Sequence, residues 1–214
     1  MKELKPDERK ALEGEYLLRI GILQNLADKL QAVVIDALQS IKHIDRIYFR
    51  VKGCESFLKK ALDKRRNYIE PLIEIEDQIA GRVLVFYEYD LEIVRKILDG
   101  TFHFIEADIK RPEEFNEFGY ETDHYIFLIP KNMLPRQWNE YENLPTTAEL
   151  QIRTLFMHAY AEPQHDIDFK GSGNLPNNIR RQLAWIAASA WGGDHAYSEI
   201  IRWMRESGKF PEIF

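Results

Sequence analysis

The chain has little cysteine and no long apolar run, and each absence excludes a class of protein. The single cysteine, Cys54, excludes an internal disulfide framework and fits a reducing cytoplasm. No stretch approaches the roughly 18 apolar residues of a membrane span, and the charged N-terminus lacks the apolar core of a signal peptide. No repeat or linker divides the 214 residues. We therefore predict one soluble globular domain, 1–214, with a cytoplasmic location and no membrane partner.

Positive charge is scarce overall but concentrated in one segment. The net charge of −6 argues against a general nucleic-acid binder. Residues 42–66 nevertheless carry nine basic residues against three acidic ones, a local charge of +6. Such a block predicts a polyphosphate ligand or a nucleic-acid end, with a solvated helix face as the alternative. The basic residues are Lys42, Arg46, Arg50, Lys52, Lys59, Lys60, Lys64, Arg65 and Arg66.

The most informative stretch is 147–170. Apolar and polar residues alternate in its first half, which predicts a strand with one buried face. Thr154 then suits the N-cap of a helix that begins near Leu155. A carboxylate and a guanidinium four residues apart on one strand face, Glu149 and Arg153, suit a metal and a phosphate, although these two residues alone fit a solvated strand face better. The apolar set is Ala148, Leu150 and Ile152, and the polar set is Glu149, Gln151 and Arg153.

This stretch resembles the synthetase domain of the RelA/SpoT family. The run 149–154, ELQIRT, is similar to the family signature E-(I/V/L)-Q-I-R-T. The following Ala161, His165, Phe169 and Lys170 resemble the pattern W-A-x-x-E-H-x-x-x-Y-K, with Gln164 in place of its Glu. We expect Pro163 to interrupt the helix, because proline lacks an N–H and clashes with the preceding turn.

Three earlier segments resemble further motifs of the family, in the family's order. Residues 50–60 are similar to R-V-K-x-x-x-S-I-x-x-K, preceded by Phe49 instead of the usual glycine. Residues 77–82 are similar to D-x-x-G-x-R, with the glycine one place late at Gly81. Residues 119–124 are similar to G-Y-x-S-x-H, with Glu121 where many alarmone synthetases carry a basic or amide residue. The four motifs lie within about residues 42–170.

The resemblance implies a role for each matching residue. Asp77 and Glu149 would be catalytic and hold Mg²⁺, and Glu149 would help to deprotonate the acceptor hydroxyl. Arg82 would stack on the adenine of ATP, and Tyr120 would stack on the acceptor base. The ATP-binding set is Arg50, Lys52, Ser56, Lys60 and Arg82. The acceptor-binding set is Tyr120, His124, Gln151, Arg153, His165 and Lys170.

The fold implied by the resemblance is α/β, with a mixed sheet of about five strands flanked by helices, as in nucleotidyltransferases. An N-terminal helix (1–42) would precede the synthetase core (43–170), and C-terminal helices (171–214) would follow. Periodicity predicts strands at 47–52, 83–87, 102–110, 125–129 and 148–153 and a lid or loop at 131–145. It also predicts helices at 7–42, 56–67, 91–98 and 176–204, with breaks at Gly100 and at Gly192–Gly193.

The implied function is transfer of the β,γ-pyrophosphate of ATP to the 3′-hydroxyl of GDP or GTP, which makes (p)ppGpp and releases AMP. One alternative is a toxin of the same family that modifies the tRNA 3′-CCA end or an adenosine nucleotide. Another is a non-catalytic nucleotide-binding module. A homo-oligomer and an antitoxin partner stay open. His158, Glu162 and His165 share a helical face that suits zinc, and His165-Asp166 resembles the dipeptide of HD hydrolases, but we favour a phosphate-contacting or otherwise satisfied His165.

Overall fold

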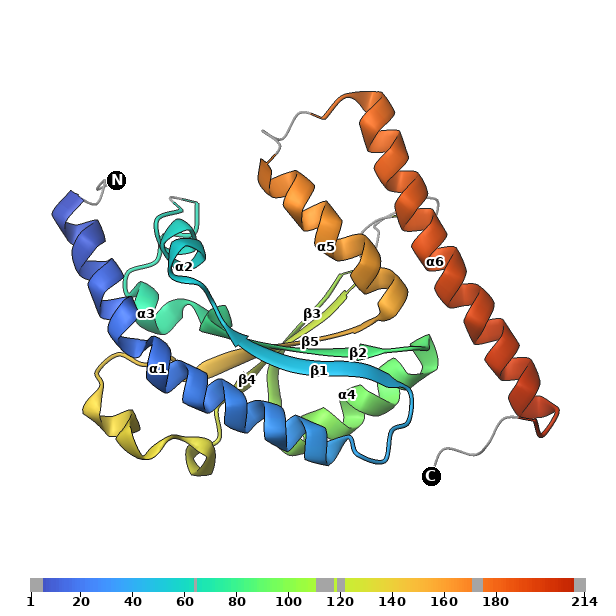
Figure 1. Ribbon diagram of the computed structural model, residues 1–214, viewed down its shortest axis with the longest axis horizontal. Helices are drawn as coiled ribbons and strands as arrows, with labels where there is room; N and C mark the ends of the chain where they lie inside the picture. The colour runs from blue at the N-terminus through green and yellow to red at the C-terminus, as the bar shows by residue number, and fades with distance from the viewer. Residues whose placement is uncertain (1–5, 64, 111–117, 119–121, 171–174, 210–214) are drawn as a thin grey trace.

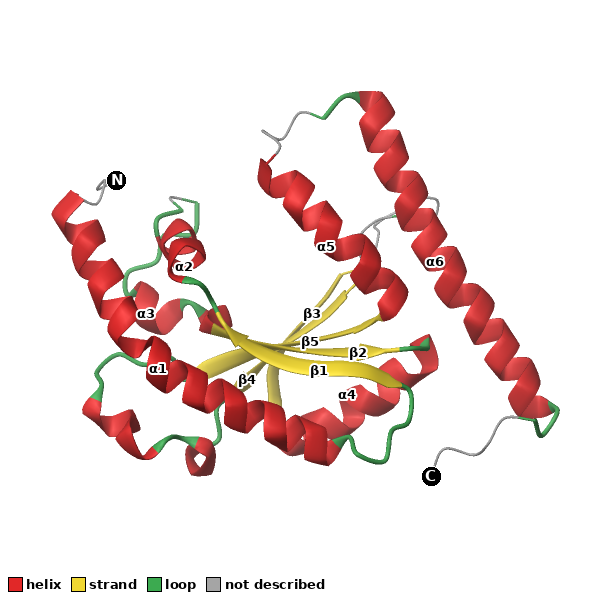
Figure 2. Cartoon of the chain, in the orientation of Figure 1, coloured by secondary structure: helices red, strands yellow, loops and turns green. Residues whose placement is uncertain are grey.

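A mixed five-stranded sheet runs through the middle of the computed structural model (Figures 1 and 2), which describes residues 6–63, 65–110, 118, 122–170 and 175–209. The strand order is β1-β2-β5-β4-β3. Only β2 and β5 pair in parallel, and the other three pairs are antiparallel. The predicted fold class is therefore confirmed. The strands are β1 (Ile44–Val51), β2 (Ile79–Val85), β3 (Phe104–Lys110), β4 (Thr122–Leu128) and β5 (Thr147–Thr154).

Helices lie on both sides of the sheet. Figure 1 shows α1 (Pro6–Ala37) and α4 (Glu88–Phe102) below the sheet, and α2 (Cys54–Ala61) and α5 (Leu155–Lys170) above it. The long α6 (Asn177–Glu206) packs along α5 and reaches α4. A short α3 (Pro71–Glu74) and a turn of 3-10 helix, η1 (Glu76–Gln78), lead into β2. Two further 3-10 turns, Lys131–Met133 and Arg136–Glu140, form the predicted loop.

One face of the sheet forms the core, because alternate residues of each strand point to it. The predicted apolar side of β5 is confirmed: Ala148, Leu150 and Ile152 are fully buried. They join Val83 of β2, Phe127 of β4 and the buried leucines of α1 in one cluster. Complete burial of such a side chain contributes about 1.5–3 kcal/mol. This packing fixes the register of β5 and leaves Glu149, Gln151 and Arg153 on the opposite face.

Two predicted helix breaks are wrong. Helix α6 continues through Gly192 and Gly193, and Gly193 allows the Phe156 ring of α5 to pack closely, because a Cβ there would lie 2.7 Å from the ring. Helix α4 continues through Gly100 and ends at Phe102, and His103, the residue after it, takes the left-handed conformation with φ 57°. Packing against neighbours thus outweighs the low helix propensity of glycine, which is about 1 kcal/mol per residue.

Two further boundaries differ from the prediction. Pro163 does not interrupt α5, which runs to Lys170; Pro163 and Ala159 are both exposed, so water can satisfy the carbonyl that the missing N–H leaves unpaired. Helix α2 ends at Ala61, well short of residue 67. Beyond it the Asp63 carboxylate accepts hydrogen bonds from the backbone and side chain of Arg65, a local turn that competes with the helix.

None of the helices within the described ranges is long and apolar enough to cross a membrane.

Candidate active site

Polar side chains form a row across four strands on the face of the sheet opposite the core. Strand pairing sets Arg82 of β2 beside Gln151 of β5, and Tyr48 of β1 beside Arg82. On the other side of β5, His124 of β4 pairs with Gln151. Because paired residues in neighbouring strands point to the same face, all four side chains share one surface. The register also sets Glu149 beside Ala80, two residues closer to η1 and therefore on the same face.

At the η1 end of this surface, Asp77 binds two lysines. Its carboxylate lies 2.8 Å from the ammonium of Lys52, just past β1, and 2.9 Å from that of Lys60 in α2. Burial alone would raise the pKa of Asp77, but the two ammonium groups outweigh burial and lower that pKa. The structure thus joins two predicted ATP-binding lysines and a predicted metal ligand in one charged group.

Two buried side chains position this group. The Gln78 amide donates to the carbonyls of Leu72 and Ile75 at 2.8 and 3.0 Å, which fixes the turn that carries Asp77. The Tyr16 hydroxyl of α1 donates to the Lys52 carbonyl at 2.7 Å. The sequence indicated only a packing role for α1, because a tyrosine on an apolar helical stripe gives no sign of this bond.

Glu76 is a neighbour of this site that the sequence analysis missed. Burial raises the pKa of its carboxyl, and the nearby carboxylates of Glu106, Asp77 and Glu149 raise it further, whereas Lys60 lowers it. These mutual effects show that Asp77 and Glu149 belong to one electrostatic neighbourhood although they come from different elements. The available signal was the position of Glu76 directly before Asp77.

Gln151 is the hub of the hydrogen bonds along β5. Its amide N–H donates to Glu149, and its amide oxygen accepts from Arg82 Nε at 3.1 Å and Arg153 Nη2 at 2.5 Å. His124 Nδ1 lies 3.7 Å from the same Glu149 carboxylate. The amide can make this set of bonds in only one orientation, so Gln151 holds a carboxylate and two guanidinium groups in a fixed arrangement.

Arg82 and Arg153 share a carboxylate from α5. Arg82 Nη1 donates to the Tyr48 hydroxyl at 2.7 Å and to Glu162 at 2.5 Å, and Arg153 Nη1 lies 3.8 Å from Glu162. The two guanidinium groups are buried, at 10% and 2% exposed, whereas the Glu162 side chain is 51% exposed. One oxygen of Glu162 therefore occupies a doubly cationic position that also suits a phosphate oxygen.

His158, one turn before Glu162, faces the same cations. Its Nδ1 lies 3.5 Å from Arg82 Nη1 and 3.8 Å from the Glu162 carboxylate. Burial lowers the pKa of His158, and Arg82 and Arg153 lower it further, whereas Glu162 raises it. In the part of the chain that the structure describes, no group of three His, Cys, Asp or Glu could hold a metal ion. The neighbouring Arg82 and Arg153 guanidinium groups also repel a cation beside His158 and Glu162. The His165 side chain, the third member of the zinc alternative, lies outside the described residues.

Comparison with known proteins identifies the family. The sequence pattern described as the region found in RelA / SpoT proteins matches residues 49–174. GTP pyrophosphokinase YjbM of Bacillus subtilis (strain 168) is 33% identical over 161 residues, which cover 73% of this chain and 72% of that protein. The chain belongs to the RelA/SpoT family. The resemblance that the four motifs indicated is therefore confirmed.

Solved structures share the fold. Small alarmone synthetase 1 from Bacillus subtilis matches with a TM-score of 0.67 at 23% identity, over 94% of this chain and 99% of that chain. The same protein bound to its product pppGpp matches with a TM-score of 0.65 at 24% identity, over 92% and 95%. A GTP pyrophosphokinase family protein from Streptococcus pneumoniae matches with a TM-score of 0.67 at 22% identity, over 97% and 100%. These likenesses establish the architecture of the RelA/SpoT fold for this chain.

Two predicted site residues have no contact with the polar groups described above, and the side chains of three others are not described by the structure. Arg50 is exposed on β1 opposite Ala80, and Ser56 is exposed in the first turn of α2. Tyr120 lies outside the described residues, as do the side chains of His165 and Lys170, although α5 includes both positions. Their roles stay predictions. Of the predicted acceptor-binding residues, His124, Gln151 and Arg153 are those whose side chains the structure describes.

Two departures from the RelA/SpoT motifs prove to be one structural feature. Phe49 and Gly81 stand directly opposite each other on β1 and β2. A Cβ on Gly81 would lie 2.3 Å from the Phe49 ring, so the ring covers the glycine. The Phe49 side chain fills the space that a side chain at Gly81 would need. The strand stays regular, and Ala80 and Arg82 keep their pairing with Glu149 and Gln151.

Proposed function

We propose that this RelA/SpoT-family chain is an enzyme that transfers the β,γ-pyrophosphate of ATP to the ribose 3′-hydroxyl of GDP or GTP. The products are (p)ppGpp and AMP, and the reaction takes place in the cytoplasm. The observation that carries the proposal is the Asp77–Lys52–Lys60 group beside Glu149 on one polar face. The relative named GTP pyrophosphokinase and the likeness to a synthetase bound to pppGpp support the same reaction.

The donor binds at the η1 end of this face. Lys52 and Lys60 turn from the Asp77 carboxylate to the triphosphate oxygens of ATP, and Arg50 and Ser56 approach the phosphates from β1 and α2. Arg82, aligned by Tyr48 and Gln151, meets the adenine base. Phosphoryl-type transfer depends chiefly on positioning and charge stabilisation. Cations held in fixed positions therefore supply most of what the ATP site needs.

The acceptor reacts beside β5. Its 3′-oxygen attacks the β-phosphorus of ATP as the hydroxyl proton passes to Glu149, and the bond from the β-phosphorus to the α,β-bridging oxygen breaks. AMP leaves with that oxygen. Gln151 and His124 hold the Glu149 carboxylate in place. Arg153, with His165 and Lys170 on α5, binds acceptor phosphates, and Tyr120 stacks on the base.

Asp77 and Glu149 would hold Mg²⁺, and the chemistry of these two residues fits the ion. Both supply carboxylate oxygens, the ligands that Mg²⁺ prefers. Magnesium sites of nucleotide-dependent enzymes use one or two carboxylates together with substrate phosphates, so a larger cluster of protein ligands is not needed. The ion would neutralise charge that develops on the transferred group.

The acceptor is tested by offering the purified protein labelled ATP with GDP, GTP, unlabelled ATP or bulk tRNA in separate reactions. We expect label on the guanosine nucleotides, and we expect that product to form equally in a variant in which Lys64, Arg65 and Arg66 are changed to Glu. A tRNA acceptor would instead need these cations as a phosphate track, and labelling would fall steeply with salt. Labelled tRNA with unmodified guanosine nucleotides would overturn the proposal. In the structure the Arg65 guanidinium forms an ion pair with the Asp63 carboxylate, with Nη2 2.9 Å from Oδ2.

A further inference from the structure

Helix α6 joins the active-site strand through a buried carboxylate. The Thr154 hydroxyl, at the last position of β5, donates to Asp194 of α6 at 2.6 Å. The same hydroxyl accepts a hydrogen bond from the backbone N–H of Met157 at 3.1 Å, as an N-cap residue does. Asp194 and Thr154 are both 2% exposed. One hydroxyl therefore ties together the end of β5, the start of α5 and the middle of α6.

We propose that Asp194 is a positioning residue of the active site, which acts through Thr154 to set the direction in which α5 leaves β5. The proposal deepens the proposed function and rests on it for the link to turnover. None of the motifs includes α6. Its effect reaches the site through the two segments that meet at Thr154.

Both of those segments carry side chains that contact or neighbour Arg82 in the active site. Arg153 directly precedes Thr154 on β5, and His158 and Glu162 lie one and two turns into α5. Their side chains meet at Arg82. At 1.5 Å per residue, Glu162 lies roughly 12 Å along the helix from Thr154, so a tilt of about 10° moves its carboxylate by about 2 Å. A shift of that size breaks a hydrogen bond.

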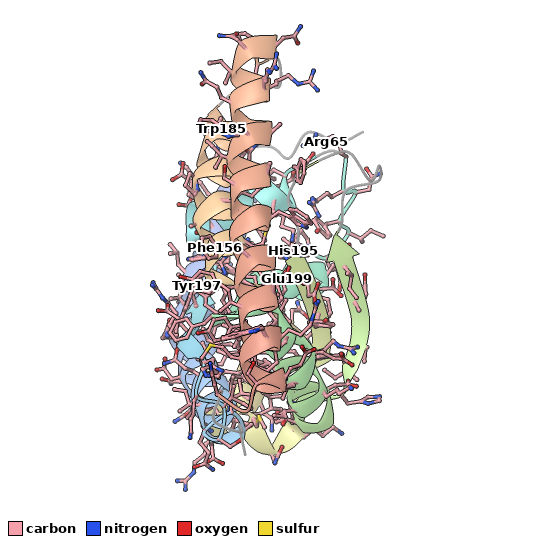
Figure 3. All side chains as sticks on the ribbon, turned by 90° about the vertical axis from the view of Figure 1, so that its right-hand side faces the viewer. Arg65, Phe156, Trp185, His195, Tyr197 and Glu199 are labelled. Carbon is pink, nitrogen blue, oxygen red and sulfur yellow. The ribbon has the colours of Figure 1, made fainter. Side chains whose placement is uncertain are left out.

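Helices α5 and α6 pack closely beside this link, which limits how far α5 can move relative to α6. A Cβ on Gly193, next to Asp194, would lie 2.7 Å from the Phe156 ring of α5. Figure 3 shows Phe156 beside α6, and the centres of the Phe156 and Tyr197 rings lie 6.0 Å apart. A second buried cluster follows along the two helices, formed by Met157, Tyr160, Ala187 and Ala190.

Packing alone does not explain a carboxylate at position 194, which is 2% exposed. Burial of an ionised group is unfavourable by several kcal/mol unless hydrogen bonds compensate it. A small apolar residue would fill this position without that cost, as Ala190 and Ala187 do about one and two turns earlier in α6. What Asp194 adds is a directional acceptor for the Thr154 hydroxyl, and direction is what the position of α5 requires.

The first test reads the position of α5 without any substrate. NMR titration of the His158 ring in the free protein reports its distance from Arg82, because burial and the Arg82 and Arg153 guanidinium groups lower the pKa of His158, against Glu162. Asp194→Ala and Thr154→Val remove the link, and Thr154→Val keeps the side-chain shape. We expect the pKa of His158 to rise in both variants and to stay at the wild-type value in Thr154→Ser, which keeps the hydroxyl.

The second test reads turnover in the same variants. We expect kcat for pyrophosphate transfer to fall about tenfold in Thr154→Val and Asp194→Ala, and to recover in Thr154→Ser. Two neighbouring glycines give matched controls: Gly193→Ala should act like the link variants because it displaces Phe156, whereas Gly192→Ala meets nothing within 4 Å and should act like wild type.

An unchanged His158 titration in folded Asp194→Ala and Thr154→Val proteins would overturn the positioning role. A shifted titration with unchanged kcat would overturn its link to catalysis. Failure of the proposed function gives a different result, in which the wild-type protein forms no pyrophosphorylated product while the His158 titration still shifts in the variants.

Discussion

Lys52 and Lys60 each place an ammonium group within 3 Å of Asp77, so the site holds two cations and their counter-ion before any nucleotide binds. We predict that Lys60→Ala lowers ATP affinity by about tenfold or more, since a hydrogen bond to a charged group contributes roughly 1.5–3 kcal/mol. Isothermal titration calorimetry measures the affinity. Lys96→Ala is the control, because Lys96 pairs with Glu92 on the exposed side of α4. Equal ATP affinity in both variants would show that Lys60 belongs to a solvated helix face and does not bind ATP.

Glu162 is the second residue whose charge the site uses. Its half-exposed carboxylate lies beside two buried guanidinium groups, so an acceptor phosphate that binds Arg153 competes with it. We predict that Glu162→Gln binds nucleotide polyphosphates more tightly than wild type and lowers the pKa of His158 further, because Glu162 raises that pKa. Calorimetry and NMR measure the two effects. Glu199→Gln is a matched control with the same 51% exposure, paired with Arg202 on α6. Weaker polyphosphate binding by Glu162→Gln would contradict the competition.

At the scale of strands, the pair of Phe49 and Gly81 ties β1 to β2 beside the site. We predict that Gly81→Ala costs about 1–3 kcal/mol of stability, because the new methyl group lies against the Phe49 ring. The cost should largely vanish in a Phe49→Ala background, a coupling that a double-mutant cycle in urea measures. Gly21→Ala, in an open position on α1, should be neutral or stabilising. Equal costs in both backgrounds would show that the pair is not coupled.

Helix α4 begins with a buried acid, which makes stability depend on pH. Burial raises the pKa of Asp90, and His43, 3.5 Å away, together with Arg205, opposes that rise. Because the folded state then holds the proton more tightly than the unfolded chain, stability falls as the pH rises from the unfolded pKa through the folded one. Asp90→Asn removes this loss. We predict that its melting temperature relative to wild type rises with pH, and a constant difference would contradict this.

Local sequence rules located most elements but not where they end. Gly100 and the Gly192–Gly193 pair are weak helix formers, yet α4 and α6 continue through them. The deciding contacts come from elsewhere in the chain, as with Phe156 against Gly193. His103 takes the left-handed position that sequence rules assign to glycine. A helix boundary that depends on tertiary contacts cannot be predicted from the sequence of the helix alone.

For the molecule as a whole, the alternation in β5 and the four motifs were enough to predict the sheet and the family, and they named Asp77, Lys52 and Lys60 as site residues without showing that the three form one ion-paired group. The sequence could not show which residues support that group, because support comes from distant elements. Tyr16 on α1 bonds the Lys52 carbonyl, and Asp194 on α6 accepts from Thr154. Neither residue stands in a motif, and each becomes recognisable only when the fold brings it to its partner.

The central claim is that this polar face transfers a pyrophosphate group with Glu149 as the base. Phosphorus NMR of wild-type protein with ATP, GDP and Mg²⁺ tests it most directly. We predict that AMP and 3′-pyrophosphorylated guanosine nucleotide form in equal amounts, and that Glu149→Gln slows both by about a hundredfold or more. Release of ADP or free pyrophosphate in place of these products, or near-full turnover by Glu149→Gln, would contradict the claim.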